Sequence, residues 1–320
     1  MSTEISFEYE ALKHYSRKGI FARTGLISQL ILDLREISKK ERSAMQEYGI
    51  NENEGIAVLQ IAIVSHIMML IEDLAIICKS IREGKINYYA YLDKTGEEDL
   101  GKIIGEFYSE INEVHVEELS KILSYADLSS FEFVSESEKS TVVEIINQMI
   151  ERSRIFFNKV TFFRMNHIKI FRRYKHAGFP ILLSQNIHEE VKKIYEGFEF
   201  VSISLTSRTK ISDEMVPLPY SEKAITSYEN LTKDILSFLG SVVHSKLICI
   251  ERKMSGLIPY KDNLFGINFS KKEIDLLDEI WKRIESKSPL PEDKSEITVK
   301  TNTEILRWYT EIENSSKRIM

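Results

Sequence analysis

The most apolar segment of the chain runs from Gly55 to Ile81 and predicts a central helix. Its apolar positions alternate steps of three and four residues and build one continuous stripe: Ile63, Ile67, Leu70, Leu74, Ile77 and Ile81. Because the other faces are also mostly apolar, such a helix is expected to be either buried or membrane-spanning. Glu72 and Asp73 interrupt the segment, and two adjacent acids would be costly within lipid. We therefore interpret this segment as a core helix and expect no membrane contact.

A second long helix is predicted from about residue 140 to residue 177. Apolar residues line one of its faces: Ile146, Met149, Phe156, Val160, Phe163, Ile170 and Tyr174. His167 falls on this face, where a packed and hydrogen-bonded core histidine is expected. Ser137 and Ser140 are candidate N-cap residues, and Gly178 marks the end of the helix.

The remaining pattern is mostly helical. Further helices are predicted at about residues 7–48, 97–112, 115–126, 221–254, 271–285 and 303–318. Residues 198–205 predict a strand that forms a hairpin with residues 180–183, whereas residues 211–219 contain two prolines and predict a loop. The expected fold is mainly α: a multi-helix bundle around two long core helices, with a small β-hairpin insertion.

Composition fits a soluble globular protein. Hydrophobic residues make up 43% and charged residues 29% of the 320 residues, and 13 glycines with six prolines favour long helices over a turn-rich β fold. The length allows a helical bundle domain at residues 1–210 and a C-terminal helical extension or subdomain at residues 211–320. The acidic N-terminus lacks the apolar core of a signal peptide, so we expect a cytoplasmic protein.

Charge separates one stretch from the rest of the chain. No Asp or Glu occurs between Glu151 and Glu189, although this stretch holds eight basic residues: Arg152, Arg154, Lys159, Arg164, Lys169, Arg172, Arg173 and Lys175. The whole chain has 43 basic and 49 acidic residues, so the remainder has 35 against 49. An acid-free basic stretch in an acidic protein indicates a place where an anion is bound.

Much of this positive charge is expected on one side of the second long helix. Positions seven apart align along a helix, and Arg152, Lys159, Asn166 and Arg173 follow this spacing. Lys169, Arg172 and His176 lie beside the C-terminal end of that line. Arginine offers a fixed fork of donors to phosphate, and histidine transfers protons near neutral pH. The cluster therefore suits metal-independent cleavage of RNA, although a helix C-terminus also favours basic residues through its dipole alone.

Polar residues on the first core helix need partners. His66 and Asp73 lie two turns apart on one face, with Glu72 beside them, and buried polar groups are normally paired. The basic face of the second helix is one sensible partner, either as a structural ion pair or as part of a site.

Several common site motifs are absent from the sequence. A di-metal carboxylate bundle needs Glu-x-x-His, which does not occur. The glycine-rich nucleotide-binding motifs and the Gly-x-Ser-x-Gly nucleophile motif are also absent. We expect no metal and no cofactor.

The segment Arg172-Arg173-Tyr174-Lys175-His176-Ala177-Gly178-Phe179-Pro180 closes a long helix with Lys-His-Ala and continues as an extended apolar segment. With Met68-Met69-Leu70-Ile71-Glu72-Asp73-Leu74 on the earlier helix, it resembles the HEPN superfamily of helical prokaryotic proteins. The resemblance covers about residues 55–205. Many members are metal-independent ribonucleases of toxin–antitoxin, abortive-infection or CRISPR-linked defence and often act as dimers. The family places four to six residues between an Arg and its His, whereas Arg172 and Arg173 have three and two residues before His176.

The resemblance implies an RNA-binding protein or metal-independent endoribonuclease. In this hypothesis His176 is the acid and base, Arg172 and Arg173 contact phosphate, and Glu72 or Asp73 orients them. The expected nucleic-acid-binding residues are Arg152, Lys159, Arg164, Asn166, Lys169 and Lys175, and Tyr174 and Phe179 are the aromatic residues close enough in sequence to stack on bases. The alternative is a non-catalytic helical interaction protein whose basic face binds an acidic protein partner or the protein's own acidic surface.

Overall fold

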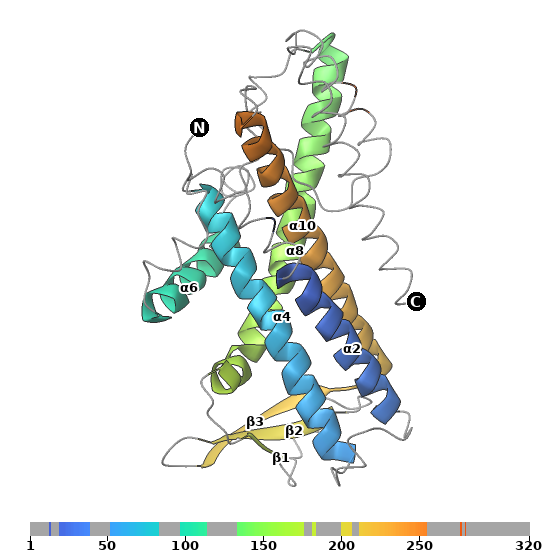
Figure 1. Cartoon of the computed structure of the whole chain (residues 1–320), viewed down its shortest axis with the longest axis vertical. Helices are drawn as coiled ribbons and strands as arrows, with labels where there is room; N and C mark the ends of the chain where they lie inside the picture. The colour runs from blue at the N-terminus through green and yellow to red at the C-terminus, as the bar shows by residue number, and fades with distance from the viewer. Residues whose placement is uncertain are drawn as a thin grey trace. The chain divides into compact units, whose positions relative to one another are not determined.

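The computed structural model describes residues 13, 19–38, 52–82, 97–113, 133–175, 181–183, 200–206, 211–254, 276 and 279. The elements in chain order are α2 (Phe21–Ser38), α4 (Glu52–Arg82), α6 (Glu97–Glu113), α8 (Glu136–Lys175), β1 (Ile181–Leu183), β2 (Phe200–Thr206), β3 (Ile211–Pro219) and α10 (Glu222–Met254) (Figure 1). The prediction of a mainly α protein is confirmed. The predicted helices at residues 115–126, 271–285 and 303–318 lie almost entirely outside the described residues.

The chain divides into two compact units, each built from separate segments. The sheet unit comprises Lys18–Ala75 and Phe157–Leu236 and carries the three strands. The terminal unit comprises Met1–Arg17, Ile76–Phe156 and Ser237–Met320. The single boundary that the sequence predicts at residue 210 stays a prediction.

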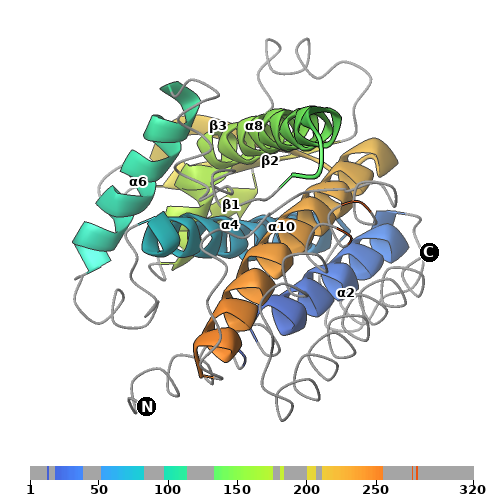
Figure 2. The same cartoon turned by 90° about the horizontal axis from the view of Figure 1, so that it is seen from above.

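Four helical segments of the sheet unit contact one another in a closed ring. Arg23 on α2 pairs with Asp73 on α4, and Glu72 on α4 pairs with Lys175 on α8. The ring continues from α8 to α10, where the Phe163 and Tyr228 rings lie 6.2 Å apart edge to face. It closes through Arg35 of α2 and two acids of α10, and Figures 1 and 2 both show α2 alongside the first part of α10.

The core of the sheet unit follows the helical spacing of apolar residues. Each of the four segments contributes residues that are at least nine-tenths buried: Ile27, Ile31 and Leu34 from α2, Ile63, Ile67 and Leu70 from α4, Phe157, Val160 and Ile170 from α8, and Ile225 and Ile235 from α10. Burial of a large aliphatic or aromatic side chain contributes about 1.5–3 kcal/mol. The stripe predicted for α4 is therefore confirmed as a core face from Ile63 to Ile77, and the side chain of Ile81 lies outside the described part.

The strands form a three-stranded antiparallel sheet in the order β1-β2-β3 (Figure 1). Ile181 pairs with Leu205, and Val201 pairs with Leu218. The structure has residues 211–219 as β3, where the sequence predicts a loop. The physical reason is position: β3 is an edge strand, and prolines within sheets are confined to edge strands, strand ends and bulges.

In the terminal unit, α6 buries one face. Its buried residues are Ile104, Phe107, Tyr108 and Ile111, and the two aromatic rings meet edge to face at 5.2 Å. Phe156 of α8 stacks on Phe238 of α10 at 5.1 Å. The predicted helix at 97–112 is confirmed by α6.

The start of α8 differs from the prediction. Ser135 is the N-cap, because its Oγ accepts a hydrogen bond from Glu138 N at 3.2 Å, and Glu138 Oε2 accepts one from Val134 N at 2.8 Å. The Ser135 hydroxyl and the Glu138 carboxylate thus bind backbone N–H groups at the start of the helix, which begins at Glu136. Ser137 and Ser140, the predicted caps, lie inside the helix.

α4 alone, among the described helices, is long and apolar enough to cross a membrane. The apolar stretch is Glu52–Lys79, and 72% of it is buried inside the protein. A buried apolar helix of this kind is typical of the core of a soluble protein.

Candidate nucleic-acid interface

The two adjacent acids of α4 point to different partners. Glu72 Oε2 lies 3.0 Å from Lys175 Nζ on α8, and Asp73 Oδ2 lies 2.6 Å from Arg23 Nη1 on α2. Glu72 therefore contacts the basic helix, as the sequence suggested for this pair of acids. Asp73 is instead bound by α2, in a better-buried pair whose side chains are 15% and 27% exposed.

His66 lies close enough to Arg23 for the guanidinium to affect its titration. Burial lowers the pKa of His66, and the positive charge of Arg23 lowers it further. The buried Nδ1 of His66 has no hydrogen-bond partner within the part of the chain that the structure describes. Arg23 thus affects His66 and pairs with Asp73, a role that the sequence pattern did not predict. A signal was present, since Arg23 occupies a stripe position between Ile20 and Ile27.

The second half of α8 exposes a continuous face in the sheet unit, which we call the α8 outer face. Its members are spaced by three or four residues and are all exposed: Lys159, Phe162, Met165, Asn166, Lys169 and Arg172. Phe162 is 70% exposed and Met165 is 66% exposed. Two large apolar side chains therefore lie in solvent among three cations.

The electrostatic setting of this face is positive. No acid occurs in α8 after Glu151. Lys159 Nζ lies 3.7 Å from Asp234 Oδ2 of α10, a loose pair in which the lysine side chain is 61% exposed. Burial raises the pKa of Asp234, and the nearby Lys159 opposes that rise. Asp234 thus partly offsets the charge at one end of the face, whereas Lys169 and Arg172 lie toward the other end.

Other predicted binding residues are placed differently. Arg152 is half-buried in the terminal unit, with Nη2 at 3.4 Å from Gln148 Oε1. Arg164 is also half-buried. The Lys175 ammonium, besides its pair with Glu72, lies 5.6 Å from the centre of the Phe171 ring. These contacts use the charge of Lys175 within the protein and weaken it as a candidate for phosphate.

The predicted catalytic cluster is described only in part. Arg172 is exposed, Arg173 is in α8 without a described side chain, and His176 lies outside the described residues, as does Phe179. Glu72 and Asp73, expected to orient this cluster, pair with Lys175 and Arg23. A catalytic arrangement of His176 with the arginines stays a prediction.

His167 is the packed histidine that the sequence predicts. Its Nδ1 lies 2.8 Å from the Phe163 carbonyl oxygen, and its ring stacks on Phe163 with centroids 4.2 Å apart. Because a carbonyl only accepts, Nδ1 carries the proton and donates. Burial lowers the pKa of His167, and the hydrogen bond to the carbonyl partly counters this. The neutral tautomer fits a structural role for His167 within the sheet unit.

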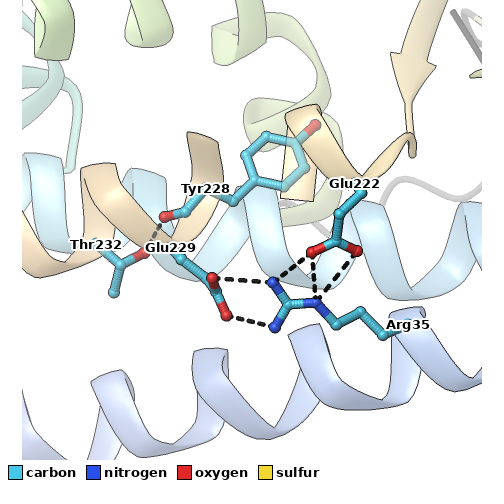
Figure 3. A network of polar contacts seen from close by, with 5 residues as sticks. All are labelled: Arg35, Glu222, Tyr228, Glu229 and Thr232. Atoms are coloured by element: carbon cyan, nitrogen blue, oxygen red, sulfur yellow. Dashed lines mark hydrogen bonds and ion pairs between the residues drawn. The ribbon is translucent and has the colours of Figure 1, made fainter. Parts of the chain in front are cut away.

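A second charged cluster, around Arg35, is satisfied internally (Figure 3). Arg35 Nη1 and Nη2 lie 2.6 and 3.0 Å from the two Glu229 carboxylate oxygens, and Arg35 Nη2 and Nε lie 2.8 and 3.0 Å from Glu222 Oε1. The hydrogen bond to Glu229 is the main cause of a raised pKa for Arg35. This cluster joins α2 to α10, and its guanidinium is bound by both carboxylates.

Within the described ranges, no group of three or more His, Cys, Asp and Glu side chains could hold a metal ion. Comparison of the chain with protein-family models, with curated proteins and with solved structures found no significant match. The α8 outer face is therefore the feature on which a functional proposal depends.

Proposed function

We propose that this chain is an RNA-binding protein and that the α8 outer face is its RNA-binding surface. The observation that carries the proposal is the exposure of Lys159, Lys169 and Arg172 along one side of a helix that has no acid after Glu151. Cations spaced along a face attract the phosphate backbone and release its counterions. Asn166, between the lysines, adds donors and acceptors for bases or sugars.

We also infer that the four contacting segments of the sheet unit form a HEPN-like helical bundle with the strands as an insertion between α8 and α10. The closed ring of contacts through Asp73, Lys175, Tyr228 and Arg35 supports this inference. The resemblance would place the protein in prokaryotic defence or in a toxin–antitoxin pair. A dimeric state, which is common in that superfamily, and a cytoplasmic location are part of the same proposal.

The proposal extends to metal-independent cleavage at the C-terminal end of α8. His176 would take the proton from a ribose 2′-hydroxyl, whose oxygen attacks phosphorus and expels the 5′-oxygen. A 2′,3′-cyclic phosphate and a 5′-hydroxyl would result, once a proton reaches the leaving oxygen. Arg172 and Arg173 would stabilise the charge that builds on the phosphate oxygens.

The test is binding and cleavage of a labelled RNA oligonucleotide by the full chain in EDTA. Three phosphate contacts predict that log K falls with log salt with a slope of about −2 on a single strand. Lys169→Gln should reduce this slope by about 0.7. Lys102→Gln removes the same charge from an exposed position on α6 and is the matched control, which should bind as wild type.

The variant His176→Ala separates binding from catalysis. Cleavage by the wild type and none by the variant would assign His176 to the active site. Binding without cleavage by either protein would leave an RNA-binding module. Absence of salt-dependent binding would overturn the proposal and favour the alternative, an acidic protein partner on the same face.

A further inference from the structure

We infer that the RNA bound by the α8 outer face is single-stranded and that an unpaired base stacks on Phe162. This inference rests on the proposed RNA-binding function and specifies its ligand. Its starting point is the phenylalanine itself, which is 70% exposed while the next residue, Phe163, is 8% exposed. An exposed aromatic ring amid cations has the composition of a stacking platform for nucleic-acid bases.

The spacing along the helix places Phe162 between phosphate-binding groups. Lys159 precedes Phe162 by three residues, and Lys169 follows it by seven, so all three lie on one face of α8. At 1.5 Å per residue the face from Lys159 to Arg172 is about 20 Å long. This length corresponds to about six nucleotides of a stacked strand at 3.4 Å each.

A single strand fits this face better than a duplex does. In a double helix the faces of the bases are covered by their neighbours, so Phe162 would have no ring to stack on, and duplex RNA is bound mainly through phosphates and 2′-hydroxyls. Unpaired bases can turn out of the strand and lie on an aromatic side chain. Met165, which is 66% exposed one turn along, adds a polarizable neighbour for the same base.

Charge favours RNA over a protein as the occupant. Two of the three cations on the face are lysines, and lysine is depleted in the cores of protein interfaces, whereas it is a common phosphate contact. Asp234 competes for Lys159 at 3.7 Å, so the share of Lys159 in phosphate binding should be reduced. A protein partner remains an outcome of the test.

The experiment measures the affinity of the full chain for a labelled 12-nucleotide single-stranded RNA and for the same sequence as a duplex. Phe162→Ala should weaken binding to the single strand by about 5- to 150-fold, which is the range measured for loss of one stacked base. Binding to the duplex should not change, and the salt dependence should stay as in the wild type. Phe162→Trp should restore single-strand binding, because it restores an aromatic face.

Met165→Ala is the matched control, since it removes a similarly exposed side chain without an aromatic ring. It should weaken binding less than Phe162→Ala does. Both positions are exposed, so thermal unfolding should confirm that the variants fold as the wild type does.

The outcomes separate this inference from the function on which it rests. If Phe162→Ala binds the single strand as wild type, or if wild type prefers the duplex, stacking on Phe162 is wrong while RNA binding by the face survives. If wild type binds neither RNA, the proposed function is overturned and this inference with it. If the chain binds RNA but Lys169→Gln leaves the slope unchanged, the RNA lies elsewhere and both are overturned.

Discussion

Helices α4 and α8 contact each other through Glu72 and Lys175, yet they distribute polar side chains in opposite ways. α4 is apolar on most sides, and its adjacent acids each pair with a cation from another helix. α8 buries one side, while its other side carries exposed cations and the exposed Phe162. A long apolar helix therefore indicates a core, whereas exposed apolar residues beside charged residues indicate a candidate functional surface.

The same substitution in two adjacent residues compares the two sides of α8, and it should give the largest change in the free energy of unfolding. Phe163→Ala should cost about 3–5 kcal/mol of unfolding free energy, because Phe163 packs on His167 and Tyr228. Phe162→Ala should change stability by no more than about 0.5 kcal/mol, because its ring is in solvent. Urea denaturation of both variants checks this. Equal losses would mean that Phe162 is not a surface residue.

Substitutions of the two adjacent acids of α4 should change the free energy of unfolding by less. Asp73→Asn should cost about 1–3 kcal/mol, because it removes the charged partner of the mostly buried Arg23. Glu72→Gln should cost at most about 1 kcal/mol, because Lys175 is 39% exposed and can be solvated. Denaturation at low and high salt measures both. A salt-sensitive loss for Asp73→Asn that matches Glu72→Gln would contradict the difference in burial.

The smallest expected change is in how stability depends on pH, which compares His66 of α4 with His167 of α8. The pKa values of His66 and His167 are lowered in the folded protein, mainly by burial. On acidification below about pH 6.5 the unfolded chain therefore takes up protons first, and stability falls until the lower folded pKa is reached. The loss should be visible between urea midpoints at pH 7.5 and pH 5.5.

Substitution should identify which histidine contributes. His66→Gln should reduce the difference between the two pH values while keeping Arg23 paired with Asp73. His167→Gln should reduce it as well, but with a loss of stability at both pH values, because the ring stacks on Phe163. A wild-type stability that rises on acidification through this range would show that neither histidine is held neutral.

The sequence predicted the parts of this fold that depend on local spacing. The stripe of α4 and the buried side of α8 follow from residues three and four apart, and the packed state of His167 follows from its place on that side. Local signals also explain the errors. Ser135 was missed as the N-cap because Ser137 and Ser140 follow closely, and β3 was missed because its prolines predict a loop.

The ion pairs of the sheet unit were harder to predict, because their partners lie far apart in the chain. Asp73 meets Arg23 across 50 residues, and Arg35 meets Glu222 across 187. Neither pairing leaves a periodic signal in one segment. Phe162 was missed for another reason: an apolar residue in a helix is expected inside, and its exposure depends on which side of α8 the other helices cover.

The Arg35 cluster fixes the register of two helices. Glu222 and Glu229 lie two helical turns apart on α10, and a single guanidinium holds both (Figure 3). A slide of α2 by one turn, about 5.4 Å, would break at least one of these contacts. Arg35 is in the last turn of α2 and Glu222 is in the first turn of α10. Each charge therefore also interacts favourably with the dipole of its own helix. One planar guanidinium thereby fixes the position of α2 along α10. A lysine in its place has a single ammonium group and could not hold both carboxylates in this way.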